Sequence, residues 1–182
     1  MLLAAGAGRR MGLPKALVDD ERGSWLVRGV ETLLQGRCRR VTVVLGAEAE
    51  RAAALLSGHP VEVRIVVAED WDEGMGASLR AGLRSLTDSD EAGAVVSLVD
   101  LPDLVPEVVA RVGAALDGPG ALARASYDGV PGHPVLLGRD HWAGVQRSAR
   151  GDRGARDYLA GREVTLVECG DLASGRDVDS RR

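Results

Sequence analysis

The sequence has a single lysine, no phenylalanine, no asparagine and only two cysteines. Lys15 is the one lysine among 23 lysine and arginine residues, so the other 22 (23 minus 1) are arginines. The formal net charge of -4 argues against a non-specific nucleic-acid binder, which carries a basic stripe. No apolar run approaches the roughly 20 residues of a membrane span. These absences leave a globular protein that acts neither on nucleic acid nor in a membrane.

The cysteines and the first residues bear on the cellular compartment. Cys38 and Cys169 show neither CxxC spacing nor a paired framework, which favours free thiols in a reducing compartment. The start at 1–6 is too short and too soon glycine-rich for a signal peptide. We therefore expect a cytoplasmic protein, and a length of 182 residues predicts one domain over 1–182.

Short apolar runs alternate with segments of helical periodicity along the chain. The runs predict strands at 2–5, 41–45, 61–67, 94–99, 121–125 and 164–167. The periodic segments predict helices at 24–34, 47–56, 78–86, 106–116 and 152–159, the first capped by Ser24. This alternation predicts an α/β fold of three layers, α/β/α, with a mostly parallel Rossmann-like sheet covered on both faces.

The strongest local signal is the glycine-rich segment that follows the first apolar run. Gly6, Gly8 and Gly12 fit neither the P-loop spacing nor the dinucleotide fingerprint, which needs GxGxxG. Glycines still let backbone N–H groups approach an anion closely. Arg10 and Lys15 add positive charge beside them, so the segment predicts a phosphate-binding loop, the alternative being a flexible turn with solvated arginines.

Several segments, in the same order, carry a resemblance to a known family. The chain resembles the molybdenum cofactor cytidylyltransferase-like nucleotidyltransferases, whose fold is that of the nucleotide-diphospho-sugar transferases. The segments that carry the likeness are LAAGAGRRMGLPK at 3–15, WDEGMGASLRAGL at 71–83, DLP at 100–102, GHPVLL at 132–137, GDRGAR at 151–156 and DVDS at 177–180. The likeness therefore spans nearly the whole chain.

This resemblance implies a reaction and a set of site residues. A nucleotidyl group would pass from a nucleoside triphosphate to an acceptor phosphate, and pyrophosphate would leave. Positioning and charge neutralisation do most of the work in such transfers. Lys15 and Arg10 are the expected catalytic cations. The expected nucleotide-binding residues are Ala4, Ala5, Gly6, Gly8, Gly74 and Ser78, although Ser78 also suits a helix N-cap.

A carboxylate site for Mg²⁺ is expected at the end of a buried strand. Asp100 directly follows the apolar run 94–99, and ligand sites in open α/β sheets gather at such ends. Mg²⁺ prefers oxygen ligands and often needs only one or two carboxylates. The family pattern implies Asp179 as the second ligand, with Asp177 as a substitute. Asp103 is a weaker metal candidate, and we expect it to cap the helix that begins near Pro106.

The sequence signals for acceptor-binding residues are less specific than those for the nucleotide and the metal. His133, between Gly132 and Pro134, is expected in a turn and has either an acceptor-binding or a structural role. Asp152 and Arg156 suit acceptor binding or the start of the late helix equally well. Asp70 stands where relatives often carry asparagine.

We therefore expect a Mg²⁺-dependent nucleotidyltransferase. The Leu-Ala-Ala-Gly start favours CTP, since guanylyl-transferring relatives tend to carry a second glycine there. The resemblance implies a molybdopterin cofactor phosphate as acceptor and a molybdoenzyme as recipient of the product. Two alternatives stay open: a nucleotidyltransferase for a sugar phosphate or other small phosphate, and a non-catalytic module that binds nucleotide or pterin.

Overall fold

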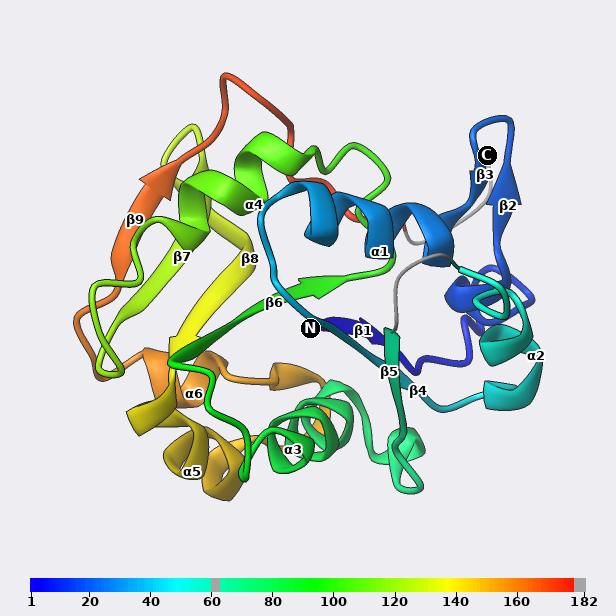
Figure 1. Cartoon of the computed structure of the whole chain (residues 1–182), viewed down its shortest axis with the longest axis horizontal. Helices are drawn as coiled ribbons and strands as arrows, with labels where there is room; N and C mark the ends of the chain where they lie inside the picture. The colour runs from blue at the N-terminus through cyan, green and yellow to red at the C-terminus, as the bar shows by residue number, and fades with distance from the viewer. Residues whose placement is uncertain (60–62, 179–182) are drawn as a thin grey trace.

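The computed structural model describes residues 1–59 and 63–178. In this part of the chain, strands form a seven-stranded sheet in the order β5-β4-β1-β6-β8-β7-β9 (Figure 1). The strands are β1 (Leu2–Ala4), β4 (Val41–Leu45), β5 (Val63–Val67), β6 (Gly93–Leu98), β7 (Leu122–Tyr127), β8 (Val130–Gly138) and β9 (Thr165–Glu168). A two-stranded ribbon of β2 (Asp19–Asp20) and β3 (Gly23–Ser24) lies apart from the sheet.

The sheet is mostly parallel, as the sequence predicts. Strand β1 lies between β4 and β6 and is parallel to both, with Leu2 opposite Val43 on one side and Ser97 on the other. Strand β8 is antiparallel to β6 and to β7. Strand β8 was not predicted, because Pro131 and Pro134 lie within it and proline removes the N–H that a strand normally donates.

Helices cover both faces of the sheet and give the predicted three layers (Figure 1). One face carries α1, α2 and α4, and the other carries α3, α5 and α6. Their bounds are α1 (Trp25–Gln35), α2 (Ala49–Ala54), α3 (Met75–Ser85), α4 (Pro106–Gly113), α5 (Arg139–Ser148) and α6 (Arg156–Leu159). No helix within the described ranges is both long and apolar enough to cross a membrane.

Strand β1 shows how the core forms on both sides of the sheet. Its side chains alternate, so Leu2 and Ala4 pack in the layer with α1, while Leu3 packs in the layer with α3. Both leucines are almost fully buried. A strand covered on both faces reads as a continuous apolar run, which is why 2–5 was recognisable in the sequence.

Helix α1 begins as predicted, with Ser24 as its N-cap. The Val27 N–H donates to Ser24 Oγ at 3.4 Å. Leu26, Val30 and Leu33 are fully buried and recur at helical spacing, which fixes the face that packs on the sheet.

Three expectations about helix ends were wrong. Helix α3 begins after Gly74, so Ser78 lies inside its first turns and is not the N-cap. Helix α4 has Val105 as its N-cap, and Asp103 does not cap it. The late helix starts at Arg156 and follows a separate 3-10 turn, Gly151–Arg153, so Asp152 lies in that turn.

Candidate active site

The glycine-rich segment leaves the carboxyl end of β1 and closes into a compact loop. The N–H groups of Met11 and Gly12 both donate to the Gly8 carbonyl oxygen, at 2.8 and 3.0 Å. Gly8 has φ +59°, and a Cβ there would lie 1.9 Å from the Leu13 carbonyl oxygen. A Cβ at Gly6, in contrast, would meet nothing within 4 Å. Gly8 therefore closes the loop, and Gly6 leaves open space beside it.

Lys15 lies at the end of this loop and meets Asp100, which lies in the turn after the neighbouring strand β6. Lys15 Nζ is 2.6 Å from Asp100 Oδ2, and the two side chains are only 18% and 15% exposed. Asp100 Oδ1 is buried and accepts no hydrogen bond from the part of the chain that the structure describes. The carboxyl ends of β1 and β6 thus bring together a cation and a carboxylate that are 85 positions apart in the sequence.

A cavity of about 540 Å³ opens at these strand ends. In a sheet of this order, the gap between β1 and β6 is the topological switch point, where open α/β sheets bind ligands. The predicted residues that line it are Ala4, Ala5, Gly6, Gly8, Arg10, Lys15, Gly74, Ser78, Asp100 and Asp152. The structure therefore gathers residues from four separate segments of the sequence around one space.

The cavity also includes residues that the sequence analysis did not assign to it. Arg9, Trp71, Asp72 and Met75 line it, as does Asp177, which we had weighed only as a substitute metal ligand. Trp71, Asp72 and Met75 belong to a segment that carried the family resemblance, so their position was a readable signal. Arg9 had no distinguishing pattern among 22 arginines.

Residues of the segment from Asp70 to Arg80 line the cavity, and contacts of Arg80 hold this segment in place. Arg80 Nη2 lies 2.6 Å from Asp70 Oδ2 and 2.8 Å from Glu73 Oε2, and Arg80 Nη1 donates to the Ala149 carbonyl oxygen at 2.9 Å. The hydrogen bonds from Arg80 hold the pKa of the Asp70 carboxyl below its usual range. Asp70 therefore anchors this segment, and Ser78, which is 4% exposed, lines the cavity from α3.

Two glycines in this segment permit close packing against the 149–152 segment. A Cβ at Gly74, which has φ +109°, would lie 2.6 Å from Asp152 Oδ1. A Cβ at Gly76 would lie 2.7 Å from the Arg150 nitrogen. Because neither glycine has a side chain, the 149–152 segment packs closely against α3 and Asp152 lies at the rim of the cavity. The two glycines of Gly-Met-Gly are therefore required for packing, in addition to any contact with a nucleotide.

His133 lies in strand β8, so the expected turn was wrong, and it is not among the residues that line the cavity. Burial lowers the pKa of His133 to about 4, and the nearby Arg124 acts in the same direction. The charge of Asp177 opposes this lowering of the pKa. An acceptor-binding role for His133 stays a prediction, and Asp179 lies outside the described residues.

The segment after β9 returns to the cavity and brings Asp177 with it. The Val178 N–H donates to the Asp100 carbonyl oxygen at 3.0 Å, which ties the two carboxylate-bearing segments together. Within the described ranges, no cluster of three or more histidine, cysteine or acidic side chains is suited to hold a metal ion. Asp100 and Asp177 are two of the four aspartates that line the cavity, the others being Asp72 and Asp152.

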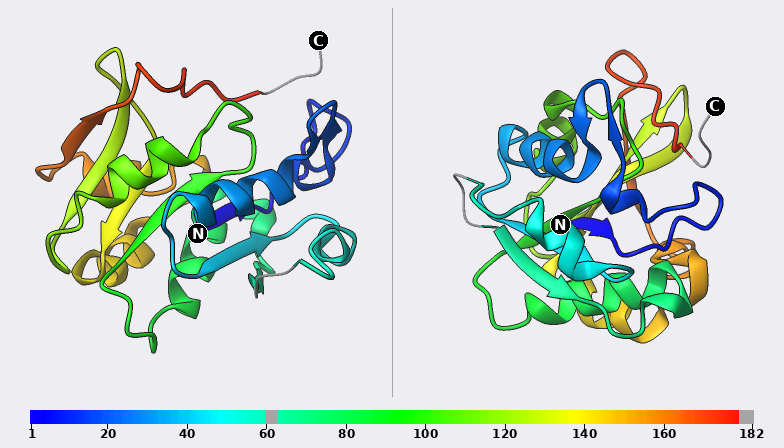
Figure 2. Two further views of the ribbon diagram at one scale, coloured as in Figure 1. Left: turned by 45° about the horizontal axis from the view of Figure 1, so that its top comes forward. Right: turned by 90° about the vertical axis from the view of Figure 1, so that its right-hand side faces the viewer.

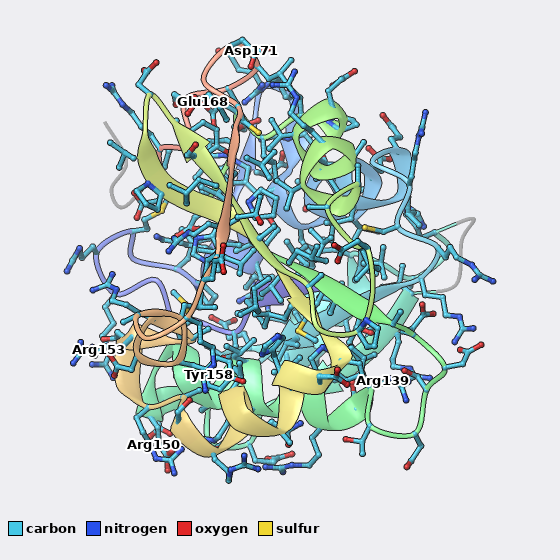
Figure 3. The ribbon with its side chains drawn as sticks, turned by 90° about the vertical axis from the view of Figure 1, so that its left-hand side faces the viewer. Arg139, Arg150, Arg153, Tyr158, Glu168 and Asp171 are labelled. Atoms are coloured by element: carbon cyan, nitrogen blue, oxygen red, sulfur yellow. The ribbon has the colours of Figure 1, made fainter. Side chains whose placement is uncertain are left out.

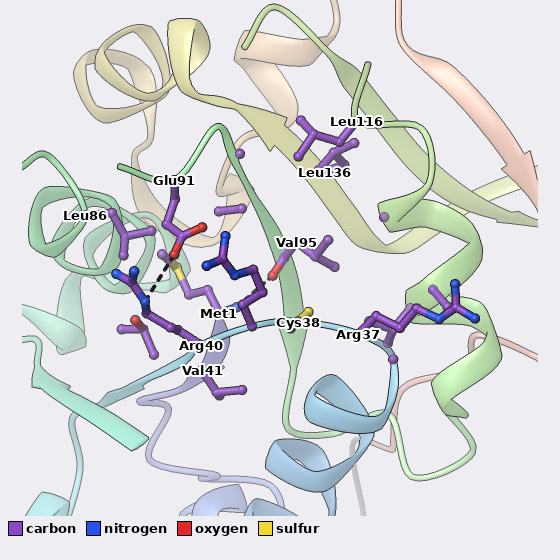
Figure 4. Close-up of a pocket in the computed structure, with 18 of the residues that line it drawn as sticks. Met1, Arg37, Cys38, Arg40, Val41, Leu86, Glu91, Val95, Leu116 and Leu136 are labelled. Carbon is purple, nitrogen blue, oxygen red and sulfur yellow. Dashed lines mark hydrogen bonds and ion pairs between the residues drawn. The ribbon is translucent and has the colours of Figure 1, made fainter. Parts of the chain in front are cut away.

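A second cavity, of about 720 Å³, lies at the amino ends of β1, β4 and β6 (Figure 4). Met1, Val95 and Leu136 give it an apolar lining, and Arg40 and Glu91 form an ion pair of 3.4 Å at its edge. None of the predicted site residues lines this cavity. It lies at the end of the parallel strands opposite to the one where α/β sheets bind their ligands.

Comparison with known proteins places the chain in a family. The family described as MobA-like NTP transferase domain matches residues 1–167. A protein named nicotine blue oxidoreductase, from Paenarthrobacter nicotinovorans, is 38% identical over 99% of this chain and 91% of its own length. A probable molybdenum cofactor guanylyltransferase from Rhodopirellula baltica is 30% identical over 69% of this chain and 59% of its own length.

Solved structures show the same fold. A nucleotidyl transferase from Methanothermobacter is similar with a TM-score of 0.82 and 22% identity, covering 98% of this chain and 90% of that one. A protein of Mycobacterium tuberculosis, Rv0371c, solved in complex with manganese, has a TM-score of 0.75 and 24% identity, over 97% and 91% of the two chains.

Proposed function

The chain belongs to the MobA-like NTP transferase family, and we propose that this nucleotidyltransferase transfers CMP from CTP to the phosphate of a molybdopterin cofactor, releasing pyrophosphate. One observation carries the proposal. Lys15 and Asp100 meet at 2.6 Å at the switch point of the sheet, beside a glycine loop in which a Cβ at Gly6 would meet nothing within 4 Å. Nucleotidyl transfer needs charge neutralisation and alignment of the reacting groups. The cavity supplies a cation, Lys15, and a carboxylate, Asp100, for this purpose.

In this proposal, Lys15 and Arg10 act on the triphosphate. Both line the cavity on the side of the glycine loop. Lysine is a compact point charge, whereas arginine is a planar fork with fixed donor directions. Lys15 therefore suits the α-phosphate, where the charge changes as the acceptor attacks, and Arg10 suits the departing pyrophosphate.

The residues present fit a divalent cation. Asp100 Oδ1 is a buried carboxylate oxygen with no hydrogen-bond partner in the described part of the chain, and Asp177 lines the same cavity. Hard oxygen ligands suit Mg²⁺ and Mn²⁺, and Mg²⁺ usually keeps waters and substrate phosphates as its other ligands. When bound, Mg²⁺ would supply neutralisation of phosphate charge. We propose Asp100 and Asp177 as its protein ligands, with Asp179 as the other candidate for the second position.

We assign recognition of the base and of the acceptor to different residues of the cavity. Ala4, Ala5 and the Gly74–Ser78 segment would hold the nucleotide. Asp152, on the rim, would bind the acceptor together with His133. Ala5 stands where guanylyl-transferring relatives tend to carry glycine, which favours the smaller cytosine base. The product would pass to a molybdoenzyme.

A crystal grown with CTP and Mg²⁺ tests the arrangement. We expect the triphosphate against the glycine loop and metal density between Asp100 and a carboxylate of 177–179. Metal density away from both Asp100 and these carboxylates would contradict the site, even if CTP were bound.

One relative motivates a second candidate function. The relative that is 38% identical is named nicotine blue oxidoreductase, so a redox activity on nicotine blue deserves a direct assay. The purified chain would be incubated with nicotine blue and NADH or NADPH, with the absorbance of both followed. Reduction of the dye at a rate that survives Lys15→Ala, without pyrophosphate release from CTP, would favour this second function.

A further inference from the structure

The residues 170–178 form a segment, here called the C-terminal strap, that continues from β9 past α4 (Figure 2). Its residue Asp177 lines the cavity. At its beginning, Arg111 of α4 binds Asp171 through two bonds, of 2.6 and 3.0 Å. Figure 3 shows Asp171 beside Glu168 at that end of β9. At its far end, Val178 is tied to the backbone of Asp100. The strap therefore spans the distance between the outer edge of the sheet and the cavity.

Asp103 holds the strap between these two ends. Its Oδ2 atom accepts from the Ser174 N–H at 2.8 Å and also from the Ser174 hydroxyl. The Ser174 oxygen in turn accepts from the Arg176 N–H at 3.3 Å. Asp103 lies three positions after Asp100 on the same loop, so one loop contacts the strap on both sides of Asp177.

Asp177 itself has little else to hold it. Its side chain is exposed at the rim of the cavity, and its carboxylate has no hydrogen bond or ion pair within the described ranges. Its position therefore depends on the backbone of the strap. Ordering a mobile side chain and backbone costs free energy, so a strap held in advance binds a cation more tightly than a loose one.

We propose that Asp103 is a positioning residue for the metal site, which acts through Ser174 to hold Asp177 opposite Asp100. Asp103 does not line the cavity, so it is not placed to be a ligand. This inference rests on the proposed function, since it takes Asp100 and Asp177 as the metal ligands. Asp103 does not cap α4, and in this proposal the function of its hydrogen bond to Ser174 is to position Asp177.

Mn²⁺ binding to the full-length protein tests the proposal, with free Mn²⁺ measured by electron paramagnetic resonance. We expect Asp103→Ala to weaken Mn²⁺ binding about tenfold, the lower end of the usual effect of groups that orient metal ligands. Ser174→Ala, an exposed change that keeps the fold, should weaken it less, since its N–H still donates. Asp103→Asn should restore much of the affinity, because its amide oxygen can accept the same bond.

A double-mutant cycle separates positioning from a direct contact with the metal. Asp103→Ala should have no further effect on Mn²⁺ affinity once Asp177 is changed to Ala. Asp90→Ala, which removes a surface carboxylate paired with Arg40, is the control and should leave the affinity unchanged. Additive effects of Asp103→Ala and Asp177→Ala, or wild-type affinity in both Asp103→Ala and Ser174→Ala, would overturn the inference.

The result for Asp100→Ala distinguishes this inference from the proposed function. If Asp100→Ala abolishes Mn²⁺ binding while the Asp103 and Ser174 variants bind normally, only the positioning role is wrong. If the wild-type protein binds no Mn²⁺, or Asp100→Ala binds it normally, the proposed metal site is wrong and the positioning role fails with it.

Discussion

Lys15 is the residue on which the proposed chemistry depends most. It is the only lysine, and its Nζ contacts the largely buried carboxylate of Asp100 at the switch point of the sheet. In an arginine-rich sequence, a lysine at this position indicates that the planar guanidinium of arginine cannot replace its compact ammonium group.

Lys15→Arg is therefore expected to lower kcat for pyrophosphate release by about 10²-fold, the usual loss when one preorganised charge is displaced. Far-ultraviolet circular dichroism should show an unchanged fold. Arg9→Lys, a neighbouring exchange in the opposite direction, is the control and should change kcat much less. Turnover of Lys15→Arg near the wild-type rate would contradict the role of Lys15.

His133 makes stability depend on pH. Its pKa is lowered to about 4 chiefly by burial, below the value of about 6.5 for an unperturbed histidine. Between these two pH values only the unfolded chain gains this proton, so the free energy of unfolding falls as the pH drops from 6.5 towards 4. Urea unfolding of the wild-type protein and of His133→Gln over this range should show a shallower pH dependence in the variant. Identical slopes would show that His133 is not buried in its neutral form.

At the scale of elements, the packing of α3 against the 149–152 segment depends on Gly74. A Cβ at this position would meet both Asp152 and the Gly151 backbone at 2.6 Å, in addition to the cost of φ +109°. Gly129 has a positive φ of 79° but open space around it. We expect Gly129→Ala to lower the free energy of unfolding by about 1 kcal/mol and Gly74→Ala by about 3 kcal/mol. Equal losses in urea unfolding would show that the contact with Asp152 is easily relieved.

Elements with strong local patterns were predictable from the sequence. Strand β4 is an uninterrupted β-branched and leucine run, and α1 combines a capping serine with a buried apolar stripe. Helix α5 was missed, because only Trp142 and Val145 of its residues are buried and its mean character is polar. Strand β8 was missed because of its prolines.

The residues of the candidate site likewise include some that could be predicted from the sequence and some that could not. The glycine loop and Asp100 could be placed from sequence, since each follows an apolar run that ends at the same edge of the sheet. The contact of Asp103 with Ser174 could not, because the two residues are 71 positions apart and nothing local marks either of them. The sequence offered Asp177 as a substitute metal ligand but not its position at the cavity, since the strap has no regular periodicity and is placed by its contacts with distant residues.

For the whole molecule, ligand binding at the switch point should stabilise the fold. CTP with Mg²⁺ would contact β1, β6, α3 and the strap together. A ligand at 100 times its Kd adds about 2.7 kcal/mol to the free energy of unfolding, which raises Tm by about 5–10 °C in a domain of this size.

Differential scanning calorimetry should show this rise with CTP and Mg²⁺ together. Chelation of the metal with EDTA should remove most of it, and Asp100→Asn should reduce it. The same rise in the presence of EDTA would mean that the nucleotide binds without the two-carboxylate site.

The most direct test of the proposed function is pyrophosphate release by the purified protein with Mg²⁺ and molybdopterin cofactor, compared across CTP, GTP, ATP and UTP. We predict release that requires the acceptor and is fastest with CTP. A preference for another triphosphate would contradict the proposed substrate. The absence of release from all four, with CTP still bound, would contradict nucleotidyl transfer to this acceptor.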